Sequence, residues 1–111
     1  VRTAAQPLGY SVADMQSNSE GDIVDVIHSA RGTHDAIIIN AGAFTHYSWA
    51  IHDALKSFEG TVIEVHISNP GAREEFRHVS VLSTVVNGTI AGFGISGYTL
   101  AVVALVELGL K

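Results

Sequence analysis

The chain of 111 residues is long enough for one compact domain and too short for two. Hydrophobic residues make up 47% of it and charged residues 15%, so a sizeable core is expected. The formal net charge of −5 disfavours nucleic acids and anionic membranes as partners, because both need clustered lysine and arginine. The chain has no cysteine, which excludes disulfide scaffolds, thiolate zinc sites and thiol nucleophiles and fits a reducing cytoplasm.

The first forty residues predict a helical tail, a strand, a helix and a second strand. Residues 1–9 resemble the end of a helix closed by Gly9, and residues 10–16 alternate as a strand does. Ser19 is a good cap for a helix that breaks at Arg31-Gly32 and buries Ile23, Val24, Ile27 and Ala30. The continuous apolar run 35–40 is typical of a parallel strand that is covered on both faces.

The remaining residues predict two further strands and two further helices. Thr45 is expected to open a helix, and residues 61–68 form a strand that stops at Pro70, which lacks the amide that a β-ladder needs. A short helical turn is expected within 71–78 and a glycine-rich strand over 88–93. The apolar residues expected to face the core are Trp49, Ala50, Ile51, Ala54, Leu55 and Phe58 of the first helix and Leu100, Val103, Ala104 and Leu108 of the last.

This order predicts a single α/β domain over residues 1–111, with a parallel sheet, helices on both faces and right-handed crossovers. The most apolar segment, residues 98–110, is shorter than the ~20 residues that span a bilayer and contains Glu107. It therefore predicts a buried helix and no membrane span.

Three polar side chains follow one another at every second position of the predicted strand 61–68. Glu64, His66 and Ser68 share one side of it, and polar groups in such a setting are costly to bury. They form either a functional site or a core polar cluster satisfied by its neighbours. Since ligands of parallel sheets bind beyond the carboxyl ends of the strands, a site there would gather a larger polar set that suits a small polyhydroxylated anion: Gln16, Asn18, Asn40 to Ala43, His46, Glu64 to Asn69, Arg73 and Arg77.

Other chemistries find less support in the sequence. The glycine pattern Gly92 to Gly97 matches a dinucleotide fingerprint, but no strand with an acidic residue ~20 positions further on follows it, so close packing of strand on helix is expected instead. The six histidines show no metal-ligand spacing such as H-E-x-x-H, and no metal site is predicted. Ser68 lacks a nucleophile elbow and is interpreted as an anion-binding hydroxyl.

Five segments together resemble the type II 3-dehydroquinate dehydratases of the shikimate pathway. They are QSNSEG (16–21), IINAGAFTH (38–46), IEVHISN (63–69), REEFR (73–77) and GFGISGY (92–98). The resemblance implies a flavodoxin-like three-layer sandwich, a cytoplasmic homo-oligomer of trimers packed into a dodecamer, and the use of no metal or organic cofactor. The implied reaction is loss of water from 3-dehydroquinate through an enolate to give 3-dehydroshikimate, in aromatic amino acid biosynthesis.

The resemblance also implies roles for individual residues. His66 would be the general acid, a task that suits an imidazole because its unperturbed pKa is ~6.5, and Glu64 would orient it. Ile67 and Ser68 would bind the substrate carboxylate, and Arg73 would serve the loop or a subunit contact. The ring hydroxyls would be held by Asn40, His46 and Arg77, while Asp53 would reach the site of a neighbouring subunit.

The sequence departs from the family at its beginning. The family starts with a strand, an Asn-Gly-Pro-Asn-like segment and a lid that carries an arginine and the tyrosine base, and none of Tyr10, Tyr47 and Tyr98 matches that tyrosine. The sequence is therefore expected to lack the amino-terminal strand, the lid and part of the first helix. Two alternatives stay open: a non-catalytic chain that retains the anion-binding pocket and the oligomer surface, and an enzyme of another flavodoxin-like family.

Overall fold

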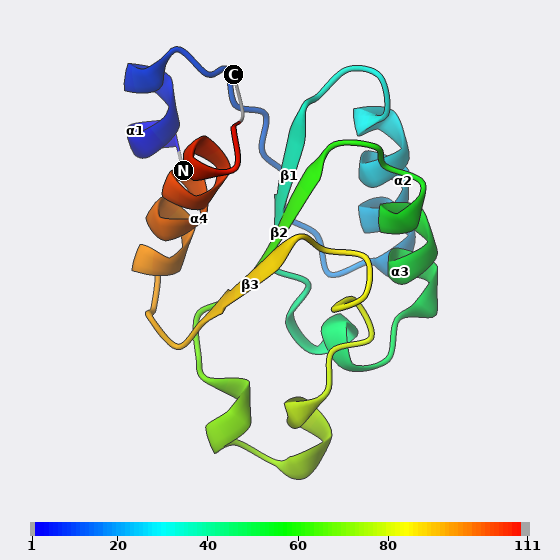
Figure 1. Cartoon of the computed structure of the whole chain (residues 1–111). Coiled ribbons are helices and arrows are strands. Elements are labelled where there is room, and N and C mark those ends of the chain that lie inside the picture. Colours follow the sequence, from blue (N-terminus) through cyan, green and yellow to red (C-terminus); the bar gives the residue numbers. More distant parts are fainter. Residues whose placement is uncertain (1, 110–111) are drawn as a thin grey trace.

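Three parallel strands form the centre of the computed structural model, which describes residues 2–109 (Figure 1). The strands β1 (Ala36–Ile39), β2 (Thr61–His66) and β3 (Gly88–Ala91) lie side by side in that order. Ile38 pairs with Ile63, and Val65 pairs with Ile90. The middle strand, β2, is buried from its second residue to its last, so its carboxyl end is the best-fixed point from which to build a site.

Helices cover both faces of this sheet (Figure 1). On one face, α2 (Glu20–Ala30) and α3 (Trp49–Lys56) pack on β1 and β2 through a core that includes Ile27, Ile51, Leu55 and Val62. On the other face, α4 (Ser96–Glu107) packs on β2 through Ala101 and Leu105, with α1 (Arg2–Ala5) beside it. This arrangement confirms the predicted α/β architecture with a parallel sheet and helices on both faces.

Several local predictions are confirmed as well. The Oγ atom of Ser19 accepts a hydrogen bond from the amide of Asp22 at 3.4 Å, so it caps α2 as expected. The polar loop after β2 contains two short 3-10 helices, η3 (Pro70–Ala72) and η4 (Glu75–His78). None of the helices within residues 2–109 has the length and apolar character that crossing a membrane would require.

The strand predicted over residues 10–16 is not formed. The segment runs as irregular chain, and its first amide, that of Tyr10, donates to the carbonyl of Ala5 at the end of α1. Alternation of apolar and polar residues describes which side chains could be buried, but a strand also needs a neighbour that completes its ladder. Within residues 2–109 the sheet consists of β1, β2 and β3 alone.

The start of the second predicted helix is also different. Thr45 lies inside a 3-10 helix, η2 (Gly42–His46), and α3 begins only after Ser48, whose Oγ accepts from the amide of Ile51 at 3.1 Å. As a consequence Trp49 stands at the first turn of α3 with 61% of its surface exposed, and Ala50 is exposed too, whereas both were predicted to face the core.

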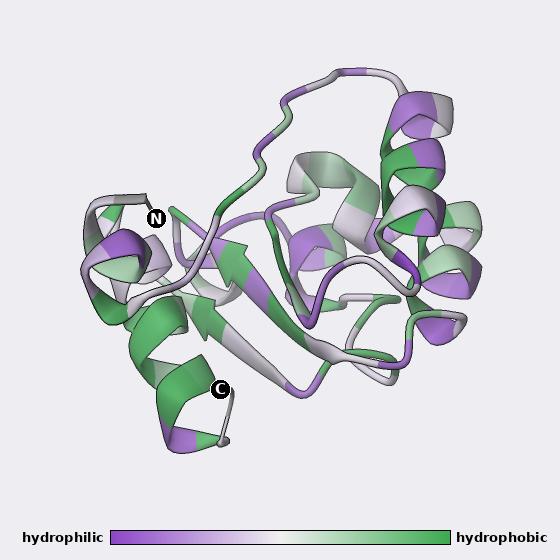
Figure 2. Ribbon diagram, turned by 90° about the horizontal axis from the view of Figure 1, so that it is seen from above, coloured by the Kyte–Doolittle hydropathy of each residue, from purple (hydrophilic) through white to green (hydrophobic). Residues whose placement is uncertain are grey.

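The last helix buries a different face from the one predicted. Its inward residues are Gly97, Ala101, Val102 and Leu105, whereas the predicted Leu100, Val103 and Leu108 are exposed and Ala104 is half-buried. Figure 2 shows why: α4 is hydrophobic around nearly its whole circumference. A helix of this kind gives no periodic signal from which its buried face could be chosen.

Candidate active site

A cavity of about 320 Å³ opens at the carboxyl ends of β1 and β2. Its lining combines two imidazoles and two guanidiniums with an amide and a hydroxyl, and none of the described residues that line it carries a carboxylate. Such a wall attracts an anion that also carries hydroxyl groups. The lining residues are Asn40, Gly42, Ala43, His46, His66, Ile67, Ser68, Arg73 and Arg77.

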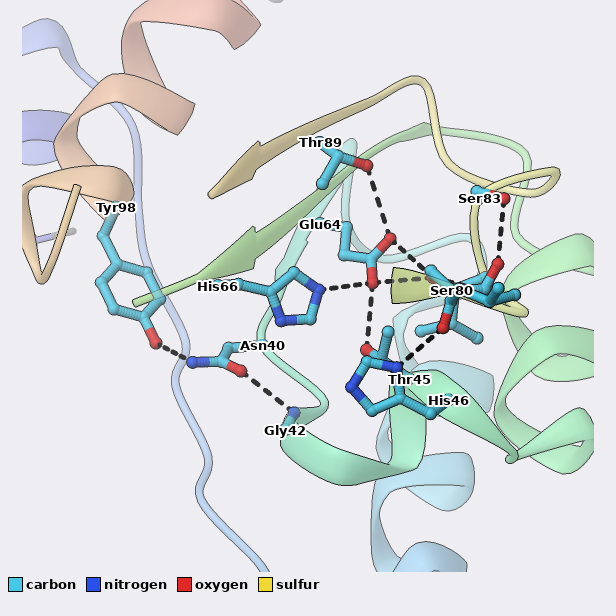
Figure 3. A network of polar contacts seen from close by, with 12 residues as sticks. Asn40, Gly42, Thr45, His46, Glu64, His66, Ser80, Ser83, Thr89 and Tyr98 are labelled. Carbon is cyan, nitrogen blue, oxygen red and sulfur yellow. Dashed lines mark hydrogen bonds and ion pairs between the residues drawn. The ribbon is translucent and has the colours of Figure 1, made fainter. Parts of the chain in front are cut away.

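His66, the last residue of β2, forms a pair with Glu64 two positions before it (Figure 3). The Nε2 atom of His66 lies 2.7 Å from the Oε2 atom of Glu64. Glu64 is completely buried, while His66 retains 8% of its surface at the cavity. Because a carboxylate can only accept, Nε2 carries the proton of this bond, and Nδ1 is the nitrogen left for a ligand.

Three hydroxyl groups from three different segments also surround the Glu64 carboxylate (Figure 3). Thr45 of η2 donates to Oε2 at 3.0 Å, and Ser80 lies 2.9 Å from Oε2 and 3.1 Å from Oε1. Thr89 of β3 is 3.4 Å from Oε1. Burial by itself would raise the pKa of Glu64, but the hydrogen bonds from His66, Ser80 and Thr45 outweigh it and hold that pKa below its usual value. Glu64 is therefore a buried anion at neutral pH.

Asn40 lies just beyond the end of β1 and is held at both ends of its amide. Its Oδ1 atom accepts from the amide of Gly42 at 3.0 Å, and its Nδ2 atom donates to the hydroxyl of Tyr98 in α4 at 3.0 Å. These bonds fix which end of the amide is which, so Asn40 presents a defined donor and acceptor to the cavity.

His46 forms the opposite wall, at the end of η2. Its Nδ1 atom lies 2.7 Å from the carbonyl oxygen of Val79, and its ring meets that of Phe76 edge to face at 5.7 Å between centroids. Since a carbonyl only accepts, Nδ1 carries the proton, and in the neutral ring Nε2 has a free electron pair. His46 can thus accept a hydrogen bond from a ligand hydroxyl.

The two arginines of the lining come from the loop that contains η3 and η4. The Nε atom of Arg77 lies 2.6 Å from Glu74, and its guanidinium stands 4.7 Å from the centre of the Phe76 ring. A hydrogen bond with its own backbone, and then the one from Arg77, lower the pKa of Glu74. Arg73 lies 3.9 Å from the same carboxylate. One acidic residue thus orients two cations at the cavity.

The end of β2 is held in place by the turn between β3 and α4. The amide of Gly92 donates to the carbonyl of His66 at 3.2 Å, and the amide of Gly94 donates to the carbonyl of Ile67 at 3.0 Å. Gly92 has φ +90°, a conformation that side chains disfavour. The glycine pattern 92–97 therefore shapes the cavity floor and, at the buried Gly97, the contact of α4 with Val65.

Most of the predicted site residues converge at this cavity. Asn40, His46, His66, Ile67, Ser68, Arg73 and Arg77 line it, and Glu64 lies directly behind His66. Gln16 and Asn18 are not among the lining residues. Asp53 is also away from it: it lies on α3, 78% of its side chain is exposed, and its Oδ1 atom is 3.0 Å from Nδ1 of His52.

The sequence-based reasoning missed the hydroxyl groups around Glu64. Thr45 was assigned to a helix start, and Ser80 and Thr89 were given no role, because a serine in a polar loop or a threonine in a short strand carries no signal of its own.

Within residues 2–109, no group of three or more histidine, aspartate and glutamate side chains is placed to hold a metal ion.

Comparison with known proteins agrees with this geometry. The family model described as dehydroquinase class II matches residues 1–106. The chain is 57% identical over 105 residues to the 3-dehydroquinate dehydratase of Caldicellulosiruptor bescii, covering 94% of this chain and 72% of that protein, and 54% identical over 103 residues to that of Halalkalibacterium halodurans, covering 93% and 71%. The crystal structure of the type II dehydroquinase from Propionibacterium acnes superposes with a TM-score of 0.90 at 45% identity, over 96% of this chain and 73% of that one.

Proposed function

The chain belongs to the class II dehydroquinases, so its activity is that of a 3-dehydroquinate dehydratase, a hydro-lyase of the shikimate pathway with a flavodoxin-like fold, and we infer that His66 is its general acid. The observation that carries the inference is the buried Glu64–His66 pair, 2.7 Å apart, at the floor of a cationic cavity. The substrate is a cyclic carboxylate with ring hydroxyls and a ketone, which matches the groups that line this cavity.

Elimination of water from this substrate needs a base that removes a proton beside the ketone and an acid that protonates the departing hydroxyl. His66 supplies the second step. With Nε2 committed to Glu64, a protonated His66 transfers its proton from Nδ1, and the enolate then collapses to the conjugated enone. The buried Glu64 carboxylate stabilises the imidazolium before the transfer and keeps the ring in place after it.

The other lining residues bind the substrate. Ser68, through its hydroxyl, and the amides of Ile67 and Ser68, just beyond the last residue of β2, take the carboxylate, with Arg73 adding positive charge. Asn40, His46 and Arg77 hold the ring hydroxyls, each by the donor or acceptor that its fixed orientation leaves available. No metal or organic cofactor takes part in this proposal.

The described residues that line the cavity do not supply the tyrosine base that removes the proton beside the ketone. Within the described residues no tyrosine lines the cavity, and Tyr98 touches it only through Asn40. Residues 2–109 therefore account for the acid and for substrate binding, and we assign the base to a lid tyrosine, as the family resemblance implies.

Assembly belongs to the proposal as well. We propose a cytoplasmic homo-oligomer of trimers packed into a dodecamer, in which Asp53 completes the site of a neighbouring subunit. In support, the beginning of α3 exposes Trp49 and, just before it, Tyr47, which is 58% exposed. Asp53 stands on the same helix, so a partner that covered these aromatic rings would be brought up to its carboxylate.

The acid role is tested by adding dehydroquinate to the full-length protein, in which the lid tyrosine can act as the base, and following the ultraviolet absorbance of the conjugated enone. His66→Ala should lower kcat by about 10²-fold or more. The matched control is His34→Ala, because His34 is an exposed histidine far from the cavity lining. Full activity of His66→Ala would remove His66 from the mechanism.

A second candidate function is binding of the same class of carboxylate without turnover. It is favoured by the observation that no tyrosine among residues 2–109 lines the cavity. Titration calorimetry with a ring-saturated carboxylate analogue separates the two readings. Binding that is abolished by the double change Ser68→Ala and Arg77→Ala, without any turnover, would establish the second one.

A further inference from the structure

We propose that two consecutive residues, Val79 and Ser80, are positioning residues that hold both imidazoles of the cavity. The carbonyl of Val79 fixes the proton of His46, and the hydroxyl of Ser80 fixes the carboxylate on which His66 depends. The inference rests on the proposed dehydratase function and adds a determinant outside the cavity, since neither residue is part of the lining.

The direction of the Ser80 hydroxyl is set by its neighbours. Its Oγ atom accepts a hydrogen bond from the amide of Leu82 at 3.1 Å. Its single proton is then available for Glu64, whose two oxygens lie at 2.9 and 3.1 Å. Ser80 therefore contacts both carboxylate oxygens, whereas Thr45 and Thr89 each contact one.

The segment around Ser80 is itself attached to the wall of the site. The amide of Val81 donates to the carbonyl of Thr45 at 2.8 Å, one residue before His46. The carbonyl of Val79 receives the Nδ1 proton of His46 at 2.7 Å. Because Ser80 also contacts the carboxylate that holds His66, a displacement of residues 79–81 would disturb His46 and His66 together.

The charge around Glu64 makes the effect of Ser80 measurable. Besides Ser80, the carboxylate is contacted by His66 from β2, Thr45 from η2 and Thr89 from β3, and His66 is the one titratable group among these contacts. The charged or titratable groups that line the cavity beyond His66 are His46, Arg73 and Arg77. Without the Ser80 hydroxyl, more of the carboxylate charge would act on the His66 proton.

The test compares Ser80→Ala with Ser83→Ala. Ser83 is the matched control because its hydroxyl donates to the carbonyl of Ser80 at 3.0 Å, and Glu64 is not its partner. Ser80→Ala should lower kcat roughly tenfold and leave KM within about twofold, because the lost bond supports the acid and touches no substrate. The limb of the pH–rate profile on which activity falls with rising pH should move to higher pH. Ser83→Ala should match the unmodified protein in all three.

A spectroscopic measurement and two further variants complete the test. Carboxyl ¹³C NMR should show Glu64 titrating at higher pH in Ser80→Ala, since loss of a donor raises the pKa of Glu64, and at unchanged pH in Ser83→Ala. Ser80→Thr keeps a hydroxyl and should recover most of the activity. Ser80→Cys keeps the volume with a weak donor, so it should behave like Ser80→Ala and serves as the test if the alanine variant does not fold.

The two proposals fail in distinguishable ways. If the protein turns over dehydroquinate and His66→Ala abolishes turnover, but Ser80→Ala equals Ser83→Ala in kcat and pH profile, the positioning role is overturned while the dehydratase role stands. If no variant turns over, the dehydratase role fails, and the Glu64 titration alone decides. An unchanged titration in Ser80→Ala and Ser80→Cys would then overturn the positioning role.

Discussion

Replacing Glu64 by glutamine and by alanine should give two very different stabilities. In Glu64→Ala the Thr45 hydroxyl and the Nε2 proton of His66 lose their acceptor in a region closed to water, since Glu64 is fully buried and Thr45 almost so. Each buried group left unsatisfied costs about 1–3 kcal/mol, so the pair predicts a loss of about 2–6 kcal/mol.

Glutamine can occupy the same place at a much smaller cost. Its amide oxygen takes the position of Oε2 and still accepts from His66 and Thr45. Its NH₂ group takes the position of Oε1, where the neighbours are the hydroxyls of Ser80 and Thr89, and hydroxyls can accept as well as donate. The expected loss is about 1 kcal/mol or less, although activity should fall because the imidazolium has lost its counter-charge.

The measurement is urea-induced unfolding followed by far-ultraviolet circular dichroism at neutral pH. A Glu64→Ala protein within about 1 kcal/mol of the unmodified one would show that the Thr45 and His66 donors do not need this acceptor. A glutamine variant as unstable as the alanine variant would show that an amide cannot replace the carboxylate as their acceptor.

The stability difference between the unmodified protein and Glu64→Gln should depend on pH. The pKa of Glu64 is lower in the folded protein than its ordinary value of 4.5, so the unfolded chain binds the proton more readily. The stabilisation by this carboxylate is present in full above that value and is lost as the pH falls through the folded pKa. The stability difference between the unmodified protein and Glu64→Gln should therefore shrink in acid, and a constant difference would contradict a lowered pKa.

Three further changes test the packing and the charge of the fold. Leu55→Ala, in the centre of the core between α3 and the sheet, should cost about 2–5 kcal/mol in the same urea experiment, whereas Lys56→Ala on the exposed side of α3 should cost less than ~1 kcal/mol. Gly60→Ala would place a methyl group 2.3 Å from the carbonyl oxygen of Asp35, which accepts a hydrogen bond from the amide of Thr61 at the first β1–β2 pairing, so thermal unfolding should show a loss of about 1–3 kcal/mol. The control is Gly21→Ala within α2, which should be neutral or stabilising because its methyl group would meet the Oγ atom of Ser19 at an ordinary contact distance of 3.8 Å. The affinity for the carboxylate analogue, measured by titration calorimetry, should fall as the salt concentration rises, because Arg73 and Arg77 line a cavity that is open to solvent. An affinity independent of salt would contradict a role for their charges.

The parts of the fold that the sequence predicted well are those in which one signal dominates. The short apolar runs that contain Ile38 and Val65 are typical of buried parallel strands, and both form such strands. Pro70 marks where the second run must end. Once the order of strands is known, the rule that ligands bind at their carboxyl ends brings Asn40, His46, His66 and Ser68 together without knowledge of their side-chain contacts.

The parts that were wrong or missed depend on partners that are distant in the sequence. Residues 10–16 alternate correctly, yet a strand is formed by two chains, and no pattern within one segment reports its neighbour. The helix α4 is apolar on all sides, so its buried face is set by the sheet below it. Ser80 matters because the chain folds back over β2, a fact that lies in the tertiary structure alone.

The backbone amides of Gly92 and Gly94 form hydrogen bonds with the carbonyls of His66 and Ile67. These bonds fix where the cavity lies, whereas the side chains that line it determine its chemistry. Since both bonds join main-chain atoms, they persist whatever side chains stand at positions 66 to 68. New specificities could therefore be installed in this scaffold by exchanging lining side chains one at a time. A bulky residue at position 92 would instead displace the whole floor at once, because it would meet Asn69 in a backbone conformation that only glycine adopts readily.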